Sequence, residues 1–300
     1  MEKMAEKTIV KALHDPGFFK RLKPVEMMHV LISDIIARGD VRKDCFEYWI
    51  TQEEHWPEIT PEERMDEVLR VLESDTPSTA LQGFQKVGFM GFCMPKCFPI
   101  KKLMDKKTFY LIIDHMDRLE IRHDDLAFKL ALLMFSFDPA RTEETLMDAD
   151  FDPDAVNWIC NLTYHYIEFL KLNNPKKLKK FVAKFGRDFY YDMNDYAWQV
   201  YTITGMNELK PLKSIDHVES MIKHGIPVDT DDLAMTHDDL IEAGAESEDE
   251  VFALQHILMD DAIRNPATND KEWQLARVKK LTQKEIDKKI KALKKSYQRI

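Results

Sequence analysis

Residues 226–245 read Ile-Pro-Val-Asp-Thr-Asp-Asp-Leu-Ala-Met-Thr-His-Asp-Asp-Leu-Ile-Glu-Ala-Gly-Ala, and an acidic segment then runs to Asn265-Pro266. The apolar spacing predicts a short helix that ends at Gly244, because glycine adopts the left-handed conformation at a helix end with little strain. Ser247 is expected to cap a second helix, with Glu250 three residues on as a capping box requires. Asn265-Pro266 is expected to end it. Leu233, Leu240 and Ile241 have the spacing that starts the first helix, and the apolar face of the second helix is expected to be Val251, Leu254, Ile257, Leu258 and Ile263.

The composition predicts a helical, globular chain. The 300 residues are enough for one large or two ordinary domains with a sizeable core. Charged residues make up 32% and hydrophobic residues 44%, while only 9 residues are glycine, which favours helices. No apolar run approaches the roughly 20 residues that span a bilayer, so no membrane partner is expected.

The cysteines and the N-terminus predict a cytoplasmic location. The first residues, Met1-Glu2-Lys3, contain no apolar signal core. The 4 cysteines form neither a CxxC pair nor a disulfide framework, so we expect no zinc site and a reducing compartment.

Charge is strongly segregated along the chain, although the net charge is −10. Residues 229–261 hold 12 acidic residues and no Lys or Arg. Residues 171–187 hold 7 basic residues and no acidic one, and residues 277–300 hold 10 basic and 2 acidic residues. Such segregation allows a basic patch on an acidic protein.

Two further motifs lie upstream. Residues 59–74 begin with Thr60 as a helix cap, Pro61 at the first helical position and Glu63 as the capping-box partner. A second motif, at 76–95, contains Thr-Pro-Ser-Thr-Ala-Leu, then Val-Gly-Phe-Met and Met-Pro. Together with the 226–269 stretch, these motifs resemble the bacterial CCA-adding tRNA nucleotidyltransferase and poly(A) polymerase family over roughly residues 5–280.

The resemblance implies an all-α fold, an elongated array of helices like the neck, body and tail of a CCA-adding enzyme. The neck-like region would be 1–100, the body-like region 101–225 and the tail-like region 226–300. Apolar periodicity predicts long amphipathic helices at 109–138 and 142–170 and a basic helix at about 270–297.

The sequence departs from the family where nucleotides would be selected. The neck helix of the family follows Glu-Asp-Pro-x-Arg and carries further Arg residues on one face. Here Lys23 precedes the proline, and the Arg positions hold Glu26, His29 and Ile32. Nucleotide selection is therefore not expected of this helix.

The metal-dependent parts of the family are also altered or absent. The family's phosphohydrolase signature Leu-Leu-His-Asp corresponds to residues 132–135, where Met134-Phe135 replaces the His-Asp pair. The Gly-Gly-x-Val-Arg-Asp run and metal-binding Asp-x-Asp of the catalytic head do not occur. We therefore expect no catalytic residues and no cofactor in this chain, and no nucleotide addition by the chain alone. Mg²⁺ would be needed if a separate chain supplied the head.

Residues 175–186 predict an amphipathic basic helix, with Leu178, Phe181, Val182 and Phe185 facing the core. Lysine contacts RNA phosphates without reading sequence. The candidate RNA-binding residues are Lys176, Lys177, Lys180, Lys184, Arg187 and, in the 59–74 motif, Arg64, which is also expected to brace the neck.

The leading hypothesis is a tRNA-binding helical protein, related to CCA tRNA nucleotidyltransferase, that acts without a catalytic head or with one from another chain. Other structured RNA is a further candidate ligand. One alternative is a protein-interaction scaffold that has lost RNA binding and uses the acidic face at 229–261 to bind a basic partner. Another is a component of an active tRNA nucleotidyltransferase. A solvated lysine face is the plainest explanation of the 175–186 helix.

Overall fold

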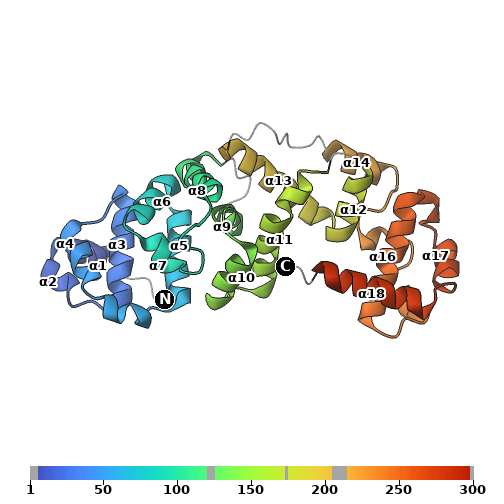
Figure 1. Cartoon of the computed structure of the whole chain (residues 1–300), viewed down its shortest axis with the longest axis horizontal. Coiled ribbons are helices and arrows are strands. Elements are labelled where there is room, and N and C mark those ends of the chain that lie inside the picture. Colours follow the sequence, from blue (N-terminus) through green and yellow to red (C-terminus); the bar gives the residue numbers. More distant parts are fainter. Residues whose placement is uncertain (1–5, 120–125, 173–174, 205–214, 298–300) are drawn as a thin grey trace. The chain divides into compact units, whose positions relative to one another are not determined.

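The computed structural model describes residues 6–119, 126–172, 175–204 and 215–297, and these ranges contain helices and loops without any strand. The all-α prediction is confirmed. Within these ranges no helix has both the length and the apolar character that crossing a membrane requires. The chain forms two compact units, unit 1 (1–164 and 202–206) and unit 2 (165–201 and 207–300), whose helices are labelled in Figure 1. The neck-like, body-like and tail-like regions expected at 1–100, 101–225 and 226–300 do not coincide with these two units, and they stay a prediction.

Unit 1 is an α-helical bundle in which α3 packs against α5 and α6, and α6 packs against α8. Proline stands at the first position of α2, α3, α5, α6, α10 and α11, where no N–H is needed. Its helices are α1 (Glu6–His14), α2 (Pro16–Phe19), α3 (Pro24–Arg38), α4 (Lys43–Ile50), η1 (Glu53–Glu58), α5 (Pro61–Glu73), α6 (Pro77–Lys86), α7 (Phe89–Cys93), α8 (Leu103–His115), η2 (Met116–Arg118), α9 (Leu126–Met134), α10 (Pro139–Asp148) and most of α11 (Pro153–Phe169).

The predicted helix ends of unit 1 are present. The Thr60 hydroxyl accepts from the Glu63 N–H at 3.2 Å, and the Glu63 carboxylate accepts from the Thr60 N–H at 2.9 Å. Gly39 ends α3 with φ 71°, in the left-handed region that glycine adopts without strain. The Met27, Met28, Leu31 and Ile35 side chains of α3 are buried.

The prediction of two long helices at 109–138 and 142–170 is wrong. The structure has separate helices α8, η2, α9, α10 and α11 over this part of the chain. Pro139 and Pro153 each stand at the first position of a new helix, because proline lacks the N–H that a continuing helix needs. Pro139 lies between the two predicted ranges, whereas Pro153 falls inside 142–170 and η2 inside 109–138, so apolar periodicity alone did not reveal these two interruptions.

Unit 2 holds α12 (Pro175–Phe185) and the tail helices around a core of its own. Leu240, Leu254 and Leu258 lie in that core, as the 226–269 stretch predicts. The other helices are α13 (Arg187–Thr204), α14 (Ile215–Lys223), η3 (Thr230–Asp232), α15 (His237–Glu242), α16 (Glu248–Arg264), η4 (Pro266–Thr268), α17 (Lys271–Val278) and α18 (Gln283–Tyr297).

Three tail details differ from the prediction. Leu233 lies between η3 and α15 instead of within one short helix. The Ser247 hydroxyl caps α16, but the Glu250 carboxylate accepts from the Glu246 N–H, one residue earlier than the capping box requires. The basic helix at 270–297 is divided into α17 and α18, and the turn between them lets Val278 and Ile286 enter the same core.

The acidic and basic runs of the tail pair with one another. Helices α16 and α18 lie side by side (Figure 1), and Lys289 contacts Asp260 at 2.8 Å. Lys294 contacts Asp249 at 2.5 Å, and the α17 residue Arg277 contacts Asp261 at 3.0 Å. The charge segregation in the sequence therefore corresponds in part to ion pairs inside unit 2.

His256 makes the stability of unit 2 depend on pH. This α16 residue is 7% exposed, and burial first and the Lys289 ammonium second lower its pKa to about 4, against a weaker opposite effect of Asp260. The unfolded chain binds the proton near pH 6.5. Stability is therefore full above pH 6.5 and falls, by roughly 1–3 kcal/mol, as the pH drops toward 4. We expect His256→Gln to flatten this part of a urea-unfolding pH profile, whereas His14→Gln, at an exposed site, leaves it in place.

Candidate nucleic-acid interface

Helix α12 is fixed in unit 2 by an aromatic face. The Phe181 ring lies 5.7 Å from Phe169 of α11 and 4.7 Å from Phe185, and the Phe185 ring lies 5.1 Å from Phe189 of α13. Leu178, Phe181 and Val182 are buried, as predicted. Because these side chains hold one face of α12 inward, the lysines between them project from the other face.

The outward side of α12 borders a cleft of about 540 Å³ in unit 2. Its polar lining has four lysines and a single carboxylate, so the local charge is positive. Leu172 and Phe181 add an apolar floor. The charged residues that line it are Glu168, Lys171, Lys177, Lys180 and Lys184.

Three of the predicted lysines therefore share one site. Lys177 and Lys180 are exposed on consecutive turns of α12, and Lys184 is half-buried one turn further on. The predicted residue Lys176 also belongs to α12, but its side chain lies outside the described residues. Exposed ammonium groups on one helix face are able to reach successive phosphates of a nucleic-acid backbone.

Lys184 differs from its neighbours in its surroundings. Its ammonium lies 4.4 Å from the centre of the Phe185 ring. Burial lowers the pKa of Lys184 below its ordinary value, and nearby Glu168 opposes this change. Lys184 thus lies between the charged rim of the cleft and the aromatic core. A phosphate bound there would offset the free-energy cost of burying its charged ammonium.

His165 borders the same region from α11. Its side chain is 3% exposed, with the ring 4.5 Å from Phe185 and Nδ1 3.1 Å from the Glu168 carboxylate. Burial lowers the pKa of His165. This packed imidazole fits a residue that supports the aromatic core.

Arg187 does not lie on the lysine face. Its guanidinium binds Asp232 of η3, with Nη2 3.1 Å from Oδ2 and 3.2 Å from Oδ1, and its backbone N–H donates to Asp229. The side chain joins α13 to the tail, so its charge is already neutralised. The structure therefore does not bring Arg187 together with the lysines of the cleft.

Arg64 lies in unit 1 and its donors are directed into the protein. Nε and Nη2 donate to the Ile59 carbonyl at 3.0 and 2.7 Å, and the guanidinium stacks on Phe92 at 5.0 Å. This geometry holds the start of α5 against α7. It is the geometry of a bracing residue, whereas RNA phosphates would need donors directed to solvent.

The position of the family's metal signature is apolar core. Leu132, Leu133 and Met134 of α9 are completely buried. Across the described ranges, no group of three or more His, Cys, Asp or Glu side chains is arranged to hold a metal ion. At the α12 cleft the described side chains offer positive charge from lysines and apolar contact from Leu172 and Phe181.

No protein-family model, curated protein or solved structure gives a significant match to this chain. Its function is therefore argued from the site, because a helical fold by itself serves many functions.

Sequence reasoning missed two parts of the cleft. Lys171 and Leu172, at the end of α11, line it together with α12. Lys171 was already visible as the first basic residue of the 171–187 run, but its place beside α12 depends on the turn between the two helices. Glu168 could not be predicted, because no local sequence pattern shows that one acidic residue of an amphipathic helix lies near a lysine of another helix.

Proposed function

We propose that this chain binds structured RNA, and tRNA in particular, through the α12 cleft. The observation that carries the proposal is the set of four lysines, with one carboxylate, around an apolar floor. Lysines attract phosphates with an affinity that depends strongly on salt. The preference for tRNA rests on the resemblance of the 59–74, 76–95 and 226–269 motifs to CCA-adding enzymes.

The proposed role is binding without nucleotide addition by this chain alone. A head supplied by a separate chain, with its own Mg²⁺, would turn the same RNA-binding surface into part of a nucleotidyltransferase. In this proposal the present chain positions the RNA, and every catalytic group belongs to the other chain.

The ion pairs of the tail favour RNA binding over the scaffold hypothesis. A protein scaffold would need the acidic residues of 229–261 to remain available for a basic partner. Asp232, Asp239, Asp249, Asp260 and Asp261 of this range contact basic side chains of unit 2. Much of the acidic surface is thus neutralised internally, which weakens its attraction for another protein.

The test is equilibrium binding of the full chain to fluorescent tRNA with and without its terminal CCA, at about 50 and 200 mM salt. A hairpin RNA of similar length serves as the control. We expect tight binding at low salt that weakens steeply at high salt, with tRNA preferred over the hairpin. Equal affinity for both RNAs would remove the tRNA preference, and absence of binding at low salt would overturn the proposal.

A further inference from the structure

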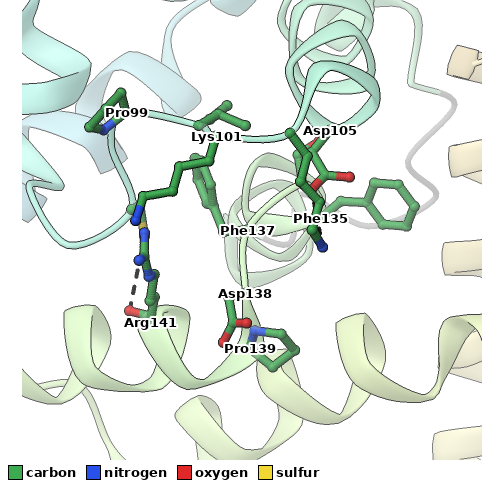
Figure 2. A pocket seen from close by; sticks show the side chains of 12 residues that line it. Pro99, Lys101, Asp105, Phe135, Phe137, Asp138, Pro139 and Arg141 are labelled. Atoms are coloured by element: carbon green, nitrogen blue, oxygen red, sulfur yellow. Dashed lines mark hydrogen bonds and ion pairs between the residues drawn. The ribbon is translucent and has the colours of Figure 1, made fainter.

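A second pocket, of about 330 Å³, lies in unit 1 (Figure 2). Its walls come from residues 97–105, which lead into α8, and residues 135–141, which lead into α10. Both segments are therefore held by the helices that follow them. The pocket shares no residue with the α12 cleft, so its ligand is a separate question from RNA binding.

Two cationic side chains converge in this pocket. Figure 2 shows the ammonium of Lys101 and the guanidinium of Arg141 on the same side, pointing toward one another. Among the described residues neither side chain has an ion pair. Two like charges that approach one another raise each other's electrostatic energy, and a bound anion between them removes this cost.

The two carboxylates of the pocket are engaged elsewhere. Asp138 caps α10 by accepting from the Ala140 N–H at 3.0 Å. Asp105 lies 3.8 Å from the Lys102 ammonium, and in Figure 2 it is on the opposite side of the pocket from Lys101 and Arg141. Neither carboxylate neutralises the converging pair.

Ser136 provides an independent indication of a ligand. Its side chain is 9% exposed and lines the pocket, and the structure gives its buried Oγ no hydrogen-bond partner among the described residues. Buried hydroxyl groups are nearly always hydrogen-bonded, so an unpaired one needs an explanation. A hydroxyl donates well to an anionic oxygen.

We propose that this pocket binds the phosphate group of a small organic phosphate. The Arg141 guanidinium supplies a planar pair of donors, the Lys101 ammonium a point charge and the Ser136 hydroxyl a third donor, which together suit the several oxygens of phosphate. Pro99, which lies on the same side of the pocket as Lys101 and Arg141 in Figure 2, and Phe137 form an apolar wall for the organic part.

The test is isothermal titration of the full chain with inorganic phosphate and with phenyl phosphate, which is a phosphate monoester with an aromatic group. We expect both to bind at one site, with phenyl phosphate the tighter because of the apolar wall. Arg141→Gln is expected to weaken both by at least about tenfold, and Ser136→Ala by about 3- to 10-fold. Lys107→Gln, on α8 but outside the pocket, makes the same charge change and is expected to leave both affinities unchanged.

Thermal unfolding of each variant accompanies the titrations, so that loss of folding is not mistaken for loss of binding. No saturable binding of either phosphate by the unmodified chain overturns the proposal, and so do equal effects of Arg141→Gln and Lys107→Gln. Binding of the Arg141→Gln variant to tRNA distinguishes the source of the phosphate. We expect the variant to bind tRNA with unchanged affinity, because the site takes a small molecule. If the variant lost tRNA affinity together with phosphate affinity, the phosphate would belong to RNA and the proposal of a small organic phosphate would be overturned.

Discussion

Replacing Glu67 with alanine is expected to lower the free energy of unfolding by about 3–5 kcal/mol. The Glu67 side chain is completely buried in unit 1, between α3 and α5. One carboxylate oxygen lies 2.7 Å from Nδ1 of His29, and the other binds the Arg70 guanidinium. Arg70 also donates to the Ser33 hydroxyl at 2.7 Å. Removal of the carboxylate leaves the remaining polar groups of this network without their partner in a dry environment.

Urea unfolding followed by circular dichroism measures this loss. Glu73→Ala is the matched control, because it removes the same side chain from an exposed position on the same helix, α5. We expect the control to change stability by less than about 1 kcal/mol. Glu67→Gln keeps the shape and some hydrogen bonds, so its effect should lie between the two. Equal effects of Glu67→Ala and Glu73→Ala would show that the buried network contributes no special stability.

Reversing two charges on α12, with Lys177→Glu and Lys180→Glu together, is expected to weaken tRNA binding by at least about tenfold. Both residues are exposed and line the cleft, so the substitutions change the surface charge while the aromatic face of the helix stays packed. Lys184 is left unchanged because its half-buried position against Phe185 would combine a loss of stability with a loss of binding.

The salt dependence of binding identifies the kind of contact that is lost. Each lysine–phosphate contact contributes about one unit to the slope of log affinity against log salt, so the double variant should reduce the slope by about 2. Lys7→Glu with Lys223→Glu makes the same change in net charge outside the cleft. If this control weakens binding as much as the α12 variant does, the effect reflects net charge and the cleft is not the RNA site.

The charged runs are visible in the sequence, but only the tertiary structure shows which of them pair with one another. The acidic run at 229–261 and the basic run at 277–300 are plain in the sequence and predict separate surfaces. In unit 2 the pairs Asp260–Lys289 and Asp249–Lys294 bring these runs into contact. The basic run at 171–187, in contrast, places several lysines around an open cleft. Pairing of this kind depends on how α16 and α18 pack, which no local pattern specifies.

The amino-acid sequence by itself determined the all-α class, the Thr60 and Ser247 caps and the buried face of α12. These features follow from interactions over one or two helical turns, such as a hydroxyl that accepts from an N–H three residues on. The break at Pro153 was also written in the sequence, but the predicted helix at 142–170 ran across it.

Only the tertiary structure decided which charged residues remain available to a ligand. Arg187 and Arg64 have the same side chain as any phosphate-binding arginine, yet the Arg187 guanidinium is paired with Asp232 and the Arg64 guanidinium donates to the Ile59 carbonyl. The convergence of Lys101 with Arg141, and of Glu67 with His29, joins residues about 40 positions apart in the chain. The physical reason is that electrostatic environment depends on distance in space and on burial, and both arise from the packing of whole helices.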